Sequence, residues 1–225
     1  MQVTRLGFSC LHIASHLKTN IPRSLHMDIE LYYTPRTRSS RPRWLLEELN
    51  IPYTLHPVDL FGGERNPIHP LGSVPAMRID GEAMFESGAM CHWLADRFPE
   101  KGLAPAFDAA SRRAYEQWMF FVPGTLEPPA FEILMHTMIL PEKHRVAEIV
   151  GFAEKGYKRV LRKLATELDH DGYLLGASFS CADIMAGSTL NWLPDMLEPY
   201  PTIQAYVQRV TARDAYARAT LPTDP

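Results

Sequence analysis

The chain has 225 residues, of which 46% are hydrophobic and 22% are charged. This is typical of a soluble protein with one large or two small domains, and no stretch approaches the ~18 apolar residues of a transmembrane helix. The formal net charge of −3 gives no reason to expect a nucleic acid or a membrane surface as partner. The three cysteines are Cys10, Cys91 and Cys181. They are too few and too far apart for a disulfide framework or a metal-binding pair, so we expect a cytoplasmic protein without a metal.

Residues 1–26 differ in composition from the rest of the chain. They contain no aspartate or glutamate and carry three basic residues, Arg5, Lys18 and Arg23. An acid-poor, basic, serine-containing segment is also typical of a transit peptide. We interpret residues 1–26 instead as an extension outside the fold, with Met27 as the working start.

Residues 27–99 predict a small α/β domain. Four runs alternate or are rich in β-branched and aromatic residues, which indicates strands at 28–33 (DIELYY), 53–60 (YTLHPVDL), 76–79 (AMRI) and 83–86 (AMFE). Asp80-Gly81 is a hairpin turn between the last two strands. Helices are predicted at 42–50, where Pro42 suits a first turn, and from Ser87 to about Phe98. The order is βαβ followed by ββα.

Residues 100–107 are a linker by composition, and residues 108–225 predict an all-helical domain. Apolar residues recur at intervals of three and four along 146–168, which indicates one long helix. A similar stripe begins at Tyr115 and is interrupted at Pro123-Gly124. Shorter helices are predicted at 181–193 and 203–216. The predicted fold class is therefore α/β plus all-α.

The sequence FSCAD, residues 179–183, is a helix start. Ser180 and Asp183 have the spacing of a capping box, in which each side chain accepts a hydrogen bond from the backbone of the other residue. This motif is structural, because it nucleates a helix and supplies no chemistry.

The sequence RTRSSRPR, residues 36–43, places four arginines around a helix start. A helix N-terminus carries positive partial charge, so cations there are unfavourable unless they extend into solvent or face an anion. Thr37, Ser39 and Ser40 add hydroxyl donors at the same place. The loop is therefore either a solvated surface or an anion-binding site.

A second candidate anion site is FESGAM, residues 85–90. Ser87 begins a helix and could offer its hydroxyl and nearby N–H groups to a carboxylate. Glu86 could accept a hydrogen bond from an ammonium group. Together they suit the head of a free α-amino acid, and alone they are a plain helix cap.

The motifs and their order resemble the glutathione S-transferase family. The resemblance runs through IELYYTP, WLLEELNIPY, HPLGSVPAM and FESGAMCHWLADRF, and continues in AYEQWMFFVPGTLEP and YLLGASFSCADIMAG. It implies a thioredoxin-like N-terminal domain, a helical-bundle C-terminal domain and a homodimer. The implied activity is attack of the glutathione thiolate on a small apolar electrophile, with glutathione as co-substrate and no further cofactor.

The resemblance also implies a glutathione-binding surface. Proline lacks an N–H and is unusual at the start of a strand, but the family has a cis-proline there, which matches Pro75. The backbone of Val74 would then pair with the cysteinyl part of glutathione like an added strand. Glu86 and Ser87 match the γ-glutamyl anchors. Ser73 stands where many relatives have Lys or Gln to hold a carboxylate.

The thiol-activating position departs from the commonest family forms. Alignment on ELYYTP places Thr37 at the serine of serine-type members and Arg38 where some bacterial members have cysteine. We expect Thr37 to donate a hydrogen bond to the glutathione sulfur, with Ser39 as the alternative donor and Arg38 adding positive charge. Tyr115 and Trp118 are the predicted contacts of the electrophile.

Two other functions remain open from the sequence. A non-catalytic glutathione-binding or protein-assembly module on the same fold is favoured by the absence of a clear catalytic residue. A thiol–disulfide oxidoreductase would need a reactive cysteine after the first strand, and none lies between Asp28 and Met90.

Overall fold

The structure is a computed structural model that describes residues 27–168 and 171–220. The predicted N-terminal extension lies outside these residues. The first part of the fold is a four-stranded mixed sheet of order β2-β1-β3-β4. Its strands are β1 (Ile29–Tyr33), β2 (Thr54–Pro57), β3 (Ala76–Ile79) and β4 (Glu82–Phe85). β1 pairs in parallel with β2 and antiparallel with β3, which pairs antiparallel with β4.

The strands follow from local sequence patterns. Along β1, buried Ile29, Leu31 and Tyr33 alternate with half-buried residues, because successive side chains of a strand point to opposite faces. The turn between β3 and β4 has φ values of 50° at Asp80 and 90° at Gly81. Asp and Gly tolerate such values, and two positive φ values define the tight turn that suits a hairpin.

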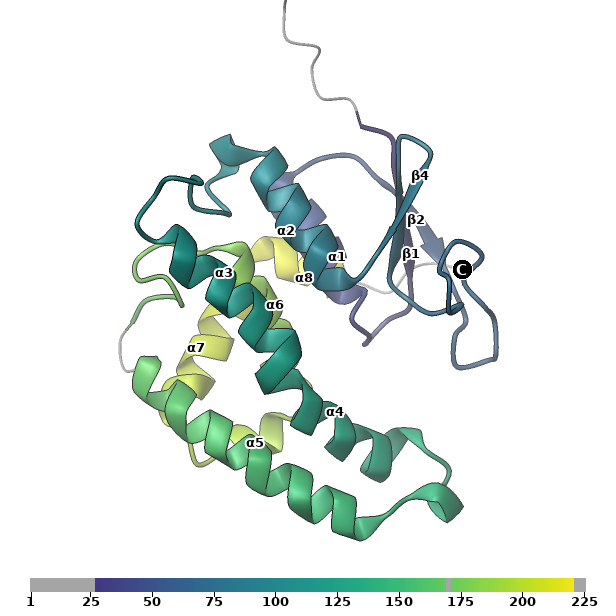
Figure 1. Ribbon diagram of the computed structural model, residues 1–225, viewed down its shortest axis with the longest axis vertical. Helices are drawn as coiled ribbons and strands as arrows, with labels where there is room; N and C mark the ends of the chain where they lie inside the picture. Colours follow the sequence, from purple (N-terminus) through teal and green to yellow (C-terminus); the bar gives the residue numbers. More distant parts are fainter. Residues whose placement is uncertain (1–26, 169–170, 221–225) are drawn as a thin grey trace, which may run out of the picture.

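Two helices cover one face of the sheet. α1 (Ser40–Leu49) and α2 (Ser87–Arg97) pack against each other and lie between the sheet and the helical half of the molecule (Figure 1). α1 ends where Asn50 adopts the left-handed conformation, a common helix stop. The element order β1-α1-β2-β3-β4-α2 confirms the predicted βαβ-ββα pattern.

The second half is helical. Its α-helices are α3 (Arg112–Phe121), α4 (Glu127–Leu134), α5 (Ala147–Glu167), α6 (Cys181–Leu190), α7 (Pro201–Thr211) and α8 (Asp214–Thr220). Short helical turns occupy Pro99–Lys101, Val122–Leu126, Met135–Ile139, Glu142–His144 and Pro194–Leu197. α4 runs alongside α5, and every residue of α6 is buried at the centre of this half (Figure 1).

Two predicted helices differ from the structure. The stripe that begins at Tyr115 does not stop at Pro123-Gly124, because the chain widens there into a π-helical turn over Val122–Leu126 and continues into α4. A π-turn accommodates a residue that lacks an N–H without ending the helix. The helix predicted at 203–216 is two helices, α7 and α8, separated at Ala212-Arg213. The capping box at Ser180 and Asp183 is confirmed, with the Ser180 N–H donating to Asp183 Oδ2 over 2.8 Å.

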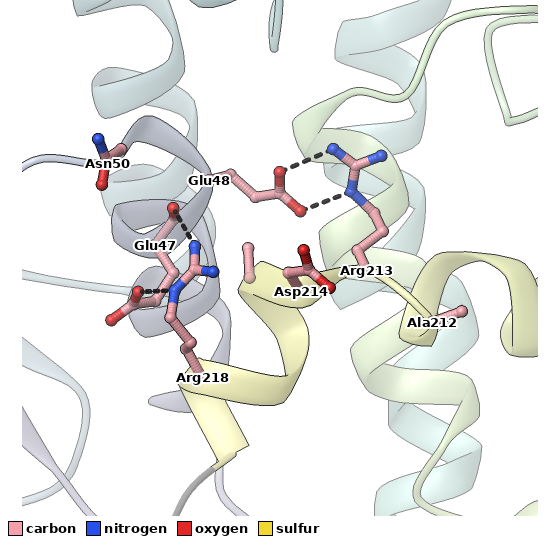
Figure 2. A pocket seen from close by; sticks show the side chains of 8 residues that line it. Glu47, Glu48, Asn50, Ala212, Arg213, Asp214 and Arg218 are labelled. Carbon is pink, nitrogen blue, oxygen red and sulfur yellow. Dashed lines mark hydrogen bonds and ion pairs between the residues drawn. The ribbon is translucent and has the colours of Figure 1, made fainter.

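One hydrophobic core continues through both halves and includes Trp44 of α1 and Ile184 of α6. Ion pairs reinforce the junction. Arg213 donates to both carboxylate oxygens of Glu48 at 2.6 and 2.8 Å, and Arg218 donates to Glu47 at 2.8 Å (Figure 2). On the α2 side, Arg112 holds Asp96 with two hydrogen bonds of 2.5 and 2.8 Å. The two halves are therefore held as one packed unit.

Candidate functional site

The predicted backbone clamp lies just before β3. The Val74–Pro75 peptide bond is cis, as predicted, and both side chains are buried, while Ser73 is half-buried. In the described part of the chain, neither the N–H nor the C=O of Val74 has a hydrogen-bond partner. An extended peptide backbone could therefore pair with this residue as an added strand.

The predicted γ-glutamyl anchors lie at the start of α2. Ser87 is the first helical residue and is buried, and its Oγ accepts a hydrogen bond from Arg41 Nη1 at 3.1 Å. Glu86 precedes it, is exposed, and has φ 72°. A positive φ is unfavourable for a residue with a side chain, and such residues cluster at ligand clamps. The Glu86–Ser87 pair therefore has the backbone signature of a binding site as well as that of a helix start.

The loop between β1 and α1 ties two predicted hydroxyls together. Thr37 Oγ1 lies 2.7 Å from the Thr34 carbonyl oxygen, and Ser39 Oγ lies 2.8 Å from the same oxygen. The two hydroxyl oxygens are 2.6 Å apart. Each hydroxyl has a single proton. Two protons therefore serve three contacts, so one contact always lacks a proton, and a Thr37 proton that turned toward a ligand would leave the other two contacts to the single proton of Ser39.

The burial of the two hydroxyls separates their roles. Ser39 is fully buried, and its Oγ also accepts the Thr34 N–H at 3.1 Å. Thr37 is half-buried. The expectation that Ser39 could serve as the alternative donor to glutathione therefore needs correction, because its hydroxyl is enclosed by the loop it holds.

Arg38 and Arg41 converge on one carboxylate of the helical half. Arg38 Nε donates to Glu127 Oε1, and Arg41 Nη2 donates to Glu127 Oε2. Arg41 Nη2 also donates to Thr189 Oγ1 at 2.7 Å. Arg41 and Glu127 are buried, whereas the Arg38 side chain is 36% exposed and borders the loop of Thr37. The arginine cluster was predicted to be either a solvated surface or an anion site. The Glu127 carboxylate thus neutralises part of the positive charge of this cluster.

Two aromatic rings flank these arginines. The Arg38 guanidinium carbon lies 4.3 Å from the centre of the Phe131 ring and 5.6 Å from the Trp192 ring. Arg41 lies 5.4 Å from Trp192. Sequence reasoning missed Glu127, Phe131 and Trp192, and the only local signal was an acidic residue within the largely apolar run of α4.

In the described part of the chain, the aromatic rings beside Arg38 are Phe131 and Trp192, and the two predicted electrophile contacts are not among them. Tyr115 is fully buried in the core, and this burial raises the pKa of its hydroxyl far above the ordinary value. The prediction that Tyr115 contacts the electrophile therefore needs correction. Trp118 is half-buried and packs edge-on against Phe121 with ring centres 5.2 Å apart. Tyr115 faces inward because it shares the apolar stripe of α3 with Met119.

Cys91 and Cys181 are both fully buried free thiols. Burial, together with the neighbouring Cys91 thiol, raises the pKa of Cys181 well above its usual range. A thiol held protonated in the core is a poor nucleophile. In residues 27–168 and 171–220, no three His, Cys, Asp or Glu side chains are grouped to hold a metal ion, and no helix is long and apolar enough to cross a membrane.

A surface pocket of about 510 Å³ lies away from this site, between the end of α1 and the α7–α8 turn (Figure 2). Its lining includes the ion pairs Glu47–Arg218 and Glu48–Arg213. These charged groups already satisfy one another, so the pocket is a feature of the junction and does not add to the site near Thr37.

Comparison with known proteins gives matches along most of the chain. A profile described as glutathione S-transferase, N-terminal domain, matches residues 37–97, and one described as glutathione S-transferase, C-terminal domain, matches residues 100–209. The disulfide-bond oxidoreductase YfcG of Escherichia coli is 29% identical over 213 residues, which span 86% of this chain and 94% of that protein.

Solved structures show the same fold. A glutathione transferase from Methylococcus capsulatus superposes with a TM-score of 0.77 at 27% identity, covering 85% of this chain and 97% of the other. A sphingomonad glutathione S-transferase complexed with glutathione gives 0.75 at 27% identity, with coverage of 85% and 96%. The predicted fold, a thioredoxin-like domain followed by a helical domain, is thereby confirmed.

Fold and site together define a two-domain protein of the glutathione-using class. The chain belongs to the glutathione S-transferase family.

Proposed function

We propose that the protein is an active glutathione transferase that joins the glutathione sulfur to a small, largely apolar electrophile. The observation that carries this proposal is the loop of Thr37, where a half-buried hydroxyl shares its acceptor with Ser39 beside a partly exposed arginine. Such a loop can present one hydrogen-bond donor and positive charge to a thiolate. A transferase of this family needs little more, because glutathione supplies the nucleophile.

Glutathione would lie along the edge of the sheet. The unpartnered backbone of Val74 would pair with its cysteinyl unit, and Glu86 and Ser87 would hold its γ-glutamyl end. Ser73 would lie toward the other end of the tripeptide. The sphingomonad relative, which was solved complexed with glutathione, supports glutathione as the ligand.

Thr37 would activate the thiol in this arrangement. An ordinary thiol with a pKa of ~8.5 is only ~3% ionised at pH 7, and lowering the pKa by ~2 units makes the thiolate the major form. A hydroxyl hydrogen bond and a nearby guanidinium have the strength to produce that shift. Ser39 would support Thr37 by donating to Thr34 in its place.

The electrophile would pack on Phe131 and Trp192 in place of Tyr115. These two rings are the aromatic groups that lie against Arg38, so they border the thiol loop. Flat apolar rings beside a thiolate suit a small hydrophobic or aromatic electrophile.

The protein would act as a homodimer. Exposed apolar side chains occur on three neighbouring elements: Phe85 on the edge strand β4, Trp93 on α2 and Phe120 on α3. α2 packs against both β4 and α3 and lies between them (Figure 1). Large apolar side chains on adjacent elements are typical of an interface.

A second candidate activity is glutathione-dependent reduction of disulfides. It is favoured by the name of the E. coli relative, a disulfide-bond oxidoreductase. In this reaction the thiolate of bound glutathione would attack one disulfide sulfur, breaking the S–S bond, forming a mixed disulfide and releasing the other sulfur as a thiol. A second glutathione would then release the remaining thiol and leave as glutathione disulfide, so the buried thiols of Cys91 and Cys181 would take no part.

The experiment measures retention of the full chain on immobilised glutathione, followed by turnover with aryl halides, epoxides, hydroperoxides and a small linear disulfide. The proposal expects retention, elution by free glutathione, and conjugation of at least one carbon electrophile. Retention with turnover of the disulfide alone would select the second candidate. Retention without any turnover would select a non-catalytic glutathione-binding module and overturn the proposal.

A further inference from the structure

Glu127 is a buried carboxylate with two cationic partners and no direct part in the site proposed above. Its side chain is 7% exposed and lies at the start of α4, in the helical half. Both partners come from the other half, Arg38 from the β1–α1 loop and Arg41 from the first turn of α1. Each carboxylate oxygen accepts from a different arginine, so the carboxylate fixes the spacing between them.

The two arginines lead to two different parts of the proposed glutathione site, the thiol loop and the γ-glutamyl anchor. Arg38 borders the thiol loop, directly after Thr37, with its guanidinium held over Phe131. Arg41 donates to the hydroxyl of Ser87, the proposed γ-glutamyl anchor. A single side chain of the helical half is therefore connected, through one arginine each, to the thiol loop and to the γ-glutamyl anchor of a site built on the sheet half.

We propose that Glu127 is a positioning residue that holds Arg38 against the thiol loop and thereby lowers the pKa of glutathione bound there. This inference rests on the proposed function, because it concerns the same thiol. Without a carboxylate to hold it, the partly exposed Arg38 side chain would extend into water, where its charge is screened from the sulfur.

The direction in which the pKa of bound glutathione changes when the Glu127 charge is removed distinguishes a positioning role from a direct effect of that charge. A carboxylate near a thiol opposes its ionisation, so removing the Glu127 charge would by itself lower the pKa of the thiol. If Glu127 acts by holding Arg38, its removal releases a cation from the site and the pKa of the thiol rises.

Glu127→Gln isolates the Arg38 contact. An amide has one acceptor oxygen where a carboxylate has two. Arg41 is fully enclosed and cannot turn to water, so it should keep that oxygen, whereas Arg38 can be solvated and should leave. The pKa of bound glutathione should then rise by about one unit, a tenfold loss of thiolate at neutral pH, with less than about a threefold change in glutathione affinity.

Glu48→Gln is the matched control. The Glu48 side chain is 8% exposed and accepts two hydrogen bonds from Arg213 across the same junction, away from the thiol loop (Figure 2). Glu48→Gln should weaken the junction between the two halves about as much as Glu127→Gln does, and it should leave the pKa of bound glutathione unchanged.

The measurement is the thiolate absorbance of bound glutathione against pH, in the wild type, Glu127→Gln and Glu48→Gln, with folding checked by circular dichroism. If Glu127→Gln does not fold, Arg38→Met removes the held guanidinium itself, leaves the Glu127–Arg41 pair intact and should raise the same pKa. In an Arg38→Met background, Glu127→Gln should give no further rise, because both changes act through one guanidinium.

An unchanged or lowered pKa in Glu127→Gln, or a rise equal to that in Glu48→Gln, would overturn the inference while leaving the proposed function intact. A further rise in the Arg38→Met background would also overturn it. A wild type that binds no glutathione would overturn both.

Discussion

At the scale of single residues, the hydrogen bonds of the β1–α1 loop decide which hydroxyl can reach a ligand. Ser39 is buried, and its hydroxyl donates a hydrogen bond to the Thr34 carbonyl and accepts one from the Thr34 N–H. Thr37 shares that acceptor and is half-buried, so its proton is the one that can be redirected. The structure thus places the two hydroxyls differently, in the order of preference that the alignment on ELYYTP implies.

Thr37→Val removes the proposed donor while keeping the shape of the side chain. The pKa of bound glutathione should rise by about one to two units, because a hydrogen bond to the charged sulfur is lost. Thr37→Ser is the control that keeps the hydroxyl and should stay within about half a unit of the wild type. The measurement is the thiolate absorbance of the bound tripeptide, and equal values for Val and Ser would show that the backbone and Arg38 activate the thiol.

At the scale of elements, several strands and helix starts in both halves follow from short-range patterns that the sequence displays. Strand β1 alternates, Asp80-Gly81 makes the turn before β4, and Ser180 with Asp183 starts α6. The partners of Arg38 could not be found this way. Glu127 is 89 residues away from it, and only the packing of α4 against the loop brings the two together.

The junction of α2 and α3 carries an expected pH dependence. Hydrogen bonds from the Arg112 guanidinium lower the pKa of Asp96 below its ordinary value, and His92 lies beside the same carboxylate. A lowered pKa in the folded state means that the unfolded chain binds more protons. The stability from this pair is therefore present above the ordinary aspartate pKa of ~3.9 and is lost as the pH falls through the lower folded value.

Asp96→Asn should reduce the free energy of unfolding at neutral pH, and its deficit relative to the wild type should shrink toward pH 3. Urea unfolding of both proteins between pH 3 and 7 gives this difference directly. Because the Asp96 side chain is 36% exposed, the deficit should be small. A deficit that stays constant over this range would show that the carboxylate contributes through its shape and not through its charge.

At the scale of the whole molecule, the two halves share one core, and groups from both meet around Arg38. The sheet half offers the Val74 backbone and the Thr37 loop, and the helical half adds Glu127, Phe131 and Trp192. Neither half alone contains the full set of groups around Arg38. This explains why the fold could be predicted from local motifs, whereas the groups around Arg38 could not.

The proposed homodimer can be tested on the same scale. Sedimentation at micromolar concentration should give twice the mass of the chain. Phe120→Glu, which places a charge on the exposed face of α3, should shift the protein toward the monomer, whereas Phe152→Glu on α5 should leave the mass unchanged. A monomeric wild type, or identical behaviour of the two variants, would contradict the proposed β4–α2–α3 interface.

The central claim is that this chain binds glutathione and ionises its thiol. The most direct measurement is the pKa of glutathione bound to the wild-type protein, read from thiolate absorbance against pH. We expect saturable binding and a pKa of about 6 to 7 for the bound thiol, well below the ~8.5 of a free thiol. Binding with a pKa that stays near ~8.5, or no binding at all, would contradict it.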